Sequence, residues 1–179
     1  MKATGIVRRI DDLGRVVIPK ELRRTLRIRE GDPLEIYTTT DGEVIFKKYS
    51  PIGELGDFAS SYVETLSKTS GLGACITDRD NVIAVSGIPK KEFLEKSVSH
   101  DIEQFMNDKT VFNSAGDSKK VLIVDSAVDY NAGVVMPIIS EGDTIGSVIF
   151  AVKAGEKPGE VEMKLAESAA GFLGKHMEG

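Results

Sequence analysis

The sequence predicts an α+β protein of two domains, a small basic β-rich head at residues 1–50 and a larger acidic body at residues 54–179. Charge is the first observation: the net charge is −5 over 179 residues, yet residues 1–50 carry eleven Lys/Arg against eight Asp/Glu and residues 51–179 carry twelve against twenty. Hydrophobic periodicity is the second, because short strand patterns in the head give way to amphipathic helix and strand patterns in the body. Ser-Pro and Gly residues between them predict a linker at residues 51–53.

The head is predicted to contain four strands and one short helix. A β-branched run between Gly14 and Pro19 is typical of a buried strand, and Pro19 suits the first turn of a helix because its missing N–H is not needed there. Asp41-Gly42 is a hairpin signal. The expected elements are strands at 5–10 and 15–18, a helix at 19–26, and strands at 33–40 and 43–49.

Basic residues concentrate at the start of the head, where residues 1–29 contain nine Lys/Arg and three Asp/Glu. At about 100° per residue, the predicted helix carries a basic stripe opposite its leucines. Such a surface on an acidic chain is typical of polyanion binding, and a solvated basic face is the alternative. The stripe comprises Lys20, Arg23, Arg24 and Arg27. Its arginines have possible ion-pair partners in Glu21, Glu30 and Asp32.

The stretch TGIVRRIDDLGRVVIPKELRRTLRIREGDPLEIYTTTDGEVIFKKY resembles the DNA-binding domain of AbrB-type transition-state regulators, over nearly all of residues 3–49. The resemblance implies a dimeric swapped-hairpin β-barrel, in which hairpins of two chains interleave, and binding to double-stranded DNA without a conventional recognition helix. It implies these DNA-binding residues: Arg8, Arg15, Arg23 and Arg24, with Arg9 beside the first. The small size of the head independently favours association with a second copy. Lys47 and Lys48, beside the linker, are expected to be solvated.

With the acidic body attached, the whole chain resembles sporulation regulators of spore-forming bacilli. That resemblance implies control of late, forespore-stage genes, with activation of some and repression of others, by a homo-oligomer that we expect to be a dimer of dimers. The AbrB-like fold also serves antitoxins. An antitoxin-like DNA-binding protein whose C-terminal domain binds a protein partner is therefore the alternative.

The body is predicted to be a GAF-like domain with an antiparallel sheet and flanking helices. One amphipathic helix begins at Glu54 and a closing helix near Gly159. Between them we expect two strands around a DRDN turn, helices within 91–107, and strands at 121–126, 133–140 and 145–152. This order resembles a GAF domain, a fold that senses small molecules. The resemblance implies that an unidentified ligand, where one binds, lies near Ile76, Phe105, Phe112, Val135 and Phe150. Each of these side chains is expected to belong to the hydrophobic core instead, so we assign no ligand-binding residues.

The composition argues against an enzyme. Cys75 is the single cysteine and the chain has two histidines, so it lacks a Cys/His zinc cluster, and we expect no metal and no cofactor. The neighbours Ser99-His100-Asp101 have triad residue types without triad geometry and are interpreted as a helix start, so no catalytic residue is expected. Because no run approaches about 18 apolar residues and the N-terminus lacks a signal-peptide pattern, we expect a cytoplasmic protein that makes no membrane contact.

Overall fold

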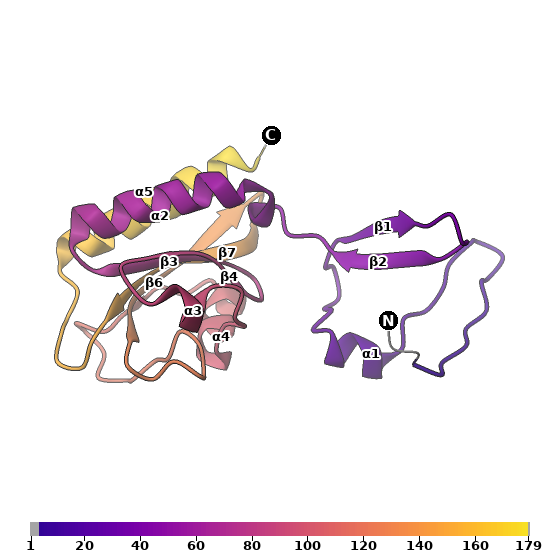
Figure 1. Cartoon of the computed structure of the whole chain (residues 1–179), viewed down its shortest axis with the longest axis horizontal. Coiled ribbons are helices and arrows are strands. Elements are labelled where there is room, and N and C mark those ends of the chain that lie inside the picture. Colours follow the sequence, from indigo (N-terminus) through magenta and orange to yellow (C-terminus); the bar gives the residue numbers. More distant parts are fainter. Residues whose placement is uncertain (1–3, 179) are drawn as a thin grey trace. The chain divides into compact units, whose positions relative to one another are not determined.

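The computed structural model describes residues 4–178, and the chain divides after Tyr49 into two compact units, the head and the body (Figure 1). Residues 51–53, expected to be a linker, belong to the body. Pro51 precedes a short 3-10 helix, η1 (Ile52–Leu55), and Ile52 has no accessible surface. Burial of this apolar side chain in a core of the body explains why the segment is not a free linker.

The described part of the head contains three regular elements: α1 (Lys20–Thr25), β1 (Leu34–Thr38) and β2 (Val44–Lys48). The two strands pair as an antiparallel hairpin that places Ile36 opposite Phe46. Its turn contains Gly42, whose φ of 83° is the left-handed conformation that glycine adopts without a Cβ penalty. The predicted hairpin is confirmed, and α1 is one residue shorter at each end than expected.

Residues 5–10 and 15–18, which we expected to be strands, form no ladder in the single chain. The turn between them is present, with Asp11 N donating to Arg15 O at 3.0 Å. A strand requires a paired neighbour for its backbone groups, and the single chain supplies none to these segments. The four-strand prediction is therefore wrong for one chain taken alone.

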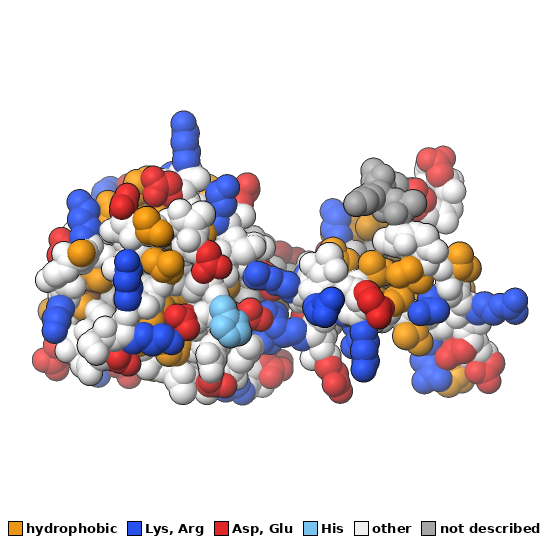
Figure 2. Space-filling model, turned by 90° about the horizontal axis from the view of Figure 1, so that it is seen from below, with side chains coloured by type: hydrophobic (Ala, Val, Ile, Leu, Met, Phe, Trp, Pro, Cys, Tyr) orange, Lys and Arg blue, Asp and Glu red, His pale blue; other side chains and the backbone are white. Residues whose placement is uncertain are grey.

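The head also has no hydrophobic core of its own. Among its described residues, 4–49, no aliphatic or aromatic side chain is buried, although Pro19 is. Figure 2 shows hydrophobic side chains gathered on the face of the head that it displays. The most exposed are Val7 (86%), Ile10 (73%), Leu13 (70%), Val17 (70%), Ile36 (61%) and Val44 (59%). Apolar surface of this extent is characteristic of a surface that a partner covers.

The body is built on a five-stranded antiparallel sheet in the order β4-β3-β7-β6-β5. Helices α2 and α5 cover one face, and α3 and α4 lie on the other (Figure 1). The strands are β3 (Gly73–Asp78), β4 (Val82–Ser86), β5 (Phe112–Asn113), β6 (Asn131–Ser140) and β7 (Asp143–Val152). The helices are α2 (Gly56–Ser70), α3 (Lys90–Phe93), α4 (His100–Asp108) and α5 (Glu160–His176). No helix in the described range is both long and apolar enough to cross a membrane.

The sheet separates two hydrophobic cores, which confirms that the five residues considered near a ligand belong to the core and rules out their grouping around one ligand. Ile76 and Phe150 belong to the core under α2 and α5. Phe112 and Val135 belong to the core on the α3 and α4 side, where Phe105 packs against them. Successive side chains of a strand point to opposite faces, so these five residues cannot line one cavity.

One predicted strand of the body is not regular. Residues 121–126 form only an isolated bridge between Leu122 and Asn131, although Val121 and Ile123 are buried. Their apolar pattern reflects burial in the α3 and α4 core rather than strand pairing. The predicted helix start is confirmed: Ser99 is the N-cap of α4, and its Oγ accepts a hydrogen bond from Ile102 N at 3.3 Å.

Gly174 in α5 tests the packing of helix on sheet. A Cβ at this position would fall on the carbonyl oxygen of Ile139 in β6. We expect Gly174→Ala to destabilise the body by about 1–3 kcal/mol, because either the helix or the strand must move. Gly171→Ala, in the same helix with no atom within 4 Å of the added Cβ, is the control and should be neutral or stabilising by up to about 1 kcal/mol. Denaturant unfolding of the full chain measures both, and equal stability of the two variants would contradict the packing.

Candidate nucleic-acid interface

The turn at residues 11–15 places Arg15 through Asp11. One carboxylate oxygen of Asp11 accepts the backbone N–H groups of Leu13 and Arg15 at 3.0 and 2.8 Å, and the other accepts Arg15 Nε at 2.8 Å. The side chain of Arg15 is 70% exposed. Only one edge of the guanidinium is therefore occupied, and its terminal nitrogens remain available for a second acceptor.

Electrostatics keep Asp11 ionised. The backbone N–H of Arg15 is the largest cause that lowers the pKa of Asp11, followed by the Arg15 guanidinium. A carboxyl group whose pKa is lowered on folding stabilises the fold above its unfolded pKa, and loses that contribution as the pH falls through the folded value. The turn therefore keeps its charged carboxylate at neutral pH.

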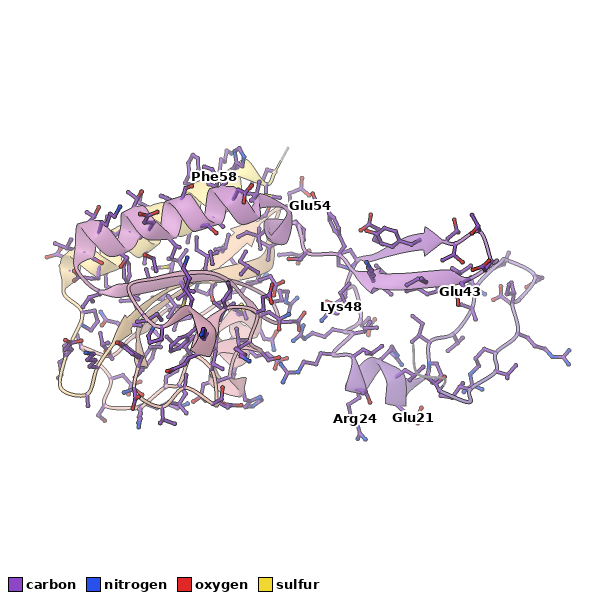
Figure 3. All side chains as sticks on the ribbon, in the orientation of Figure 1. Glu21, Arg24, Glu43, Lys48, Glu54 and Phe58 are labelled. Atoms are coloured by element: carbon purple, nitrogen blue, oxygen red, sulfur yellow. The ribbon has the colours of Figure 1, made fainter. Side chains whose placement is uncertain are left out.

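Helix α1 carries Arg23 and Arg24 in its last turn. Figure 3 shows Arg24 extending from the helix on the side away from β1 and β2. Neither arginine has an ion pair within residues 4–178, and Asp32, one of the expected partners, instead accepts a hydrogen bond from Arg29 N at 2.8 Å. The Nε of Arg23 is buried without a partner in the described chain. The surface ion-pair interpretation of these two arginines is thus not supported.

Arg8 and Arg9 lie in the extended segment before the turn and are exposed. Neither side chain makes a hydrogen bond or ion pair within the part of the chain that the structure describes. The single chain therefore fixes Arg15 by a contact and Arg23 and Arg24 by a helix, but leaves Arg8 and Arg9 without a fixed position.

Lys48, expected to be solvated, has a structural role. It is half-buried, and its Nζ donates to the carbonyl oxygen of Arg27 at 2.7 Å, which ties the end of β2 to the end of α1. Lys47 lies over the Tyr37 ring, 4.8 Å from its centroid. Sequence reasoning missed the first contact because its acceptor is a backbone atom 21 residues away, for which the sequence carries no signal.

The head is similar in sequence to known proteins. A family model described as "Antidote-toxin recognition MazE, bacterial antitoxin" matches residues 7–53. The head is 67% identical over 51 residues to the transition state regulatory protein AbrB of Bacillus subtilis (strain 168), in a match that covers 28% of this chain and 52% of that protein. The head thus has the AbrB-type fold class.

The body has the GAF fold. It aligns with the crystal structure of the GAF domain from an Acinetobacter phosphoenolpyruvate-protein phosphotransferase with a TM-score of 0.54 and 10% identity, covering 69% of this chain and 81% of that one. At this identity the likeness concerns the fold alone. An AbrB-type head joined to a GAF-fold body defines the class of protein.

The particular family follows from the full length. A family model described as "Stage V sporulation protein T C-terminal, transcription factor" matches residues 54–178. The chain is 56% identical over 179 residues to stage V sporulation protein T of Bacillus subtilis (strain 168), with 99% of each chain covered. The protein belongs to the stage V sporulation protein T family.

Asp11 supplies a test of the turn. We expect Asp11→Ala to weaken DNA binding by about tenfold, because it releases the Arg15 guanidinium and opens the turn. Asp12→Ala is the matched control: it removes the same charge next door, from a side chain with no contact in the described structure, and should leave affinity equal or raise it. Fluorescence anisotropy with a labelled duplex measures both. Tighter binding by both variants would show that Asp11 acts only as a negative charge.

Proposed function

We propose that the protein is a transcription regulator that binds double-stranded DNA through arginines of its head, and that it acts in the cytoplasm on late, forespore-stage sporulation genes as activator or repressor. The observation that carries this proposal is that Arg23 and Arg24, placed by α1, have no carboxylate partner in the described chain to neutralise them. Arg15 has such a partner, Asp11, which leaves its terminal nitrogens exposed. The relatives described above support the same conclusion.

Arginine suits this role because its planar guanidinium binds a phosphate or a guanine edge through two hydrogen bonds. Each chain has eight Lys/Arg between Arg8 and Arg29, so two associated heads present sixteen. Neutralising six to ten phosphates would lower affinity by about 10³ to 10⁵ between 50 and 200 mM salt. Binding dominated by charge is therefore expected to be strongly salt-dependent.

The head is proposed to bind DNA as a dimer. Its exposed apolar side chains include Val7 and Val17 in the two segments that lack strand partners, and Ile36 and Phe46 on the hairpin. A second copy offers both a backbone to pair with and an apolar surface to bury. Two-fold symmetry would then present the arginines twice along pseudo-symmetric DNA.

Helices α2 and α5 are proposed to join two such dimers. Phe58, Tyr62, Phe172 and His176 form a contiguous aromatic cluster on these helices, with neighbouring ring centroids 5.8–6.0 Å apart. Phe58, labelled in Figure 3, is 41% exposed and Phe172 is 49% exposed. Partly exposed aromatic side chains of this kind are enriched at protein interfaces.

A small-molecule ligand of the body is proposed to bind on the α3 and α4 side of the sheet. Two buried polar atoms at and beside the first residues of β6 have no hydrogen-bond partner in the described chain, Ser114 Oγ and Asn131 Oδ1. Buried polar atoms are normally satisfied by a protein group, water or ligand. Occupancy there would change the packing of the body and so the spacing or stability of the two heads.

An antitoxin-like role is the second candidate, because the MazE antitoxin model matches residues 7–53. In that case the body would bind a protein partner.

We propose no catalytic activity for the protein. Ser99 Oγ donates a hydrogen bond to Leu122 O at 2.6 Å, and burial raises the pKa of Cys75 to about 12. Chemical turnover of a bound small molecule would distinguish an enzyme from a regulator.

The arginines of α1 give the main test of function. We expect Arg23→Ala/Arg24→Ala to lose about 1–3 kcal/mol of binding free energy for each lost contact and to reduce the salt dependence. Lys90→Ala/Lys91→Ala, a pair of exposed basic residues in the body, is the matched control and should bind as wild type does. Anisotropy with a promoter-length duplex and random-sequence competitor, over a salt series, measures the difference.

If the folded Arg23/Arg24 variant binds DNA as tightly as wild type, the proposed role of these two arginines fails; if the wild type does not bind the duplex, the DNA-binding proposal fails. The charge would then serve a protein partner, and co-purification of a small toxin with the wild type would establish the antitoxin-like role.

The aromatic cluster gives a test of assembly. We expect Phe172→Asp to convert a tetramer into dimers, because a carboxylate in an apolar interface loses its hydration without a partner. Val111→Asp changes a body residue of similar exposure (48%) that lies outside α2 and α5, and should leave the tetramer intact. Sedimentation equilibrium measures the mass. A wild-type dimer, or an unchanged mass for Phe172→Asp, would contradict assembly through this face.

A further inference from the structure

Arg27 has an unusual backbone conformation directly after α1. Its φ is 53°, in the left-handed region. It closes the helix in a Schellman arrangement, in which Ile28 N donates to Arg23 O at 2.7 Å and Arg27 N donates to Arg24 O at 3.3 Å. Glycine usually occupies this position, because any Cβ is crowded there.

The head uses glycine at its other left-handed positions. Its described residues with positive φ are Gly5, Gly14, Gly31 and Gly42, together with Arg27. Arg27 is thus the non-glycine residue in this region among the described residues of the head, whereas Glu95, Lys109 and Glu141 adopt it in the body. Such strain persists where the surrounding structure holds the residue in place, and it occurs at functional sites.

The base of the Arg27 side chain is held in place. Its N–H is bonded to Arg24 O, and its carbonyl oxygen accepts the hydrogen bond from Lys48 Nζ described above. The side chain itself is exposed and makes no hydrogen bond or ion pair in the described range, 4–178. Within that range the Arg27 guanidinium is therefore an unpaired cation on a residue whose backbone is held by hydrogen bonds, close in the chain to Arg23 and Arg24.

We propose that Arg27 is a further DNA-binding residue, which contacts a backbone phosphate beside the site of Arg23 and Arg24. The inference rests on the proposed function of the head. Phosphate is favoured over a base edge because the guanidinium of Arg27 has no carboxylate to orient it, in contrast to Arg15, which Asp11 holds at 2.8 Å. Phosphate contacts position a protein on DNA and need only a correctly placed charge.

Arg27→Gly separates DNA binding from folding. The variant should unfold at the same or a higher temperature than wild type, because glycine relieves the strain at φ 53°. Its DNA affinity should fall at least about tenfold, equally on promoter and random duplexes, and the salt slope of a dimeric complex should fall by about two. Anisotropy over a salt series with both duplexes measures these quantities in the full chain.

Lys109→Gly is the matched control. Lys109 also has a left-handed backbone, with φ 54°, at the C-cap of α4 in the body. The substitution removes the same charge and relieves the same strain, although it also removes the hydrogen bond that Lys109 Nζ donates to Gly142 O, and it should leave DNA affinity unchanged. Arg27→Lys should retain most of the affinity, whereas Arg27→Asn, which tolerates the left-handed region, should lose as much as Arg27→Gly.

Each other outcome overturns the proposal in an identifiable way. Wild-type affinity of Arg27→Gly, with affinity still lost in Arg23→Ala/Arg24→Ala, rejects Arg27 alone and leaves the proposed function intact. Wild-type affinity in both rejects the whole end of α1 as a DNA contact, and a wild type that binds neither duplex rejects the proposed function. Loss confined to the promoter duplex with an unchanged salt slope makes Arg27 a base contact. A lower unfolding temperature for both Arg27→Gly and Arg27→Asn makes its role structural.

Discussion

The head exposes more apolar surface than one chain can bury, and the other properties of the molecule depend on this constraint. Among residues 4–49, no aliphatic or aromatic side chain is buried, whereas the body has two complete cores on either side of its sheet. A unit this small gains too little from burial to offset its conformational entropy. We therefore propose that folding of the head is coupled to association of two copies.

The proposed coupling would let a net acidic protein present a basic surface. The head carries a charge of +3 and the rest of the chain −8. In the proposed dimer the arginines of two heads belong to one assembly, and the negative charge of the bodies would disfavour DNA contact elsewhere. Two local features position the arginines within each chain and do not depend on the pairing. They are the hydrogen bonds of the Asp11 carboxylate and the capped end of α1.

The sequence predicted the elements whose signals are local. Asp41-Gly42 located the hairpin, Ser99 located the start of α4, and period-3.6 patterns located α2 and α5. Residues 5–10 also have the composition of a strand. A strand requires a neighbouring strand to pair with, and the single chain supplies none to this segment. Most of the apolar residues within 121–126 are buried as predicted, but the segment does not pair as a regular strand, because burial alone does not fix backbone geometry.

The candidate site was predicted less completely. Arg15, Arg23 and Arg24 follow from resemblance and from helical spacing, but their environment does not. The bonds of Asp11 to Arg15 depend on turn geometry. The bond of Lys48 to the Arg27 carbonyl joins residues distant in sequence, and a left-handed arginine leaves no trace in composition. These contacts depend on the path of the folded backbone, which the sequence pattern does not reveal.

The most direct measurement of the coupling is an isotope-filtered NOE experiment on full-length chains. Two differently labelled samples are unfolded, mixed and refolded together, so that contacts between chains are distinguished from contacts within one chain. If the head folds by association, methyl groups of Val7 and Val17 in one chain will show NOEs to head side chains of its partner. NOEs confined to single chains, from a protein that sediments as a monomer with a folded head, would contradict the account.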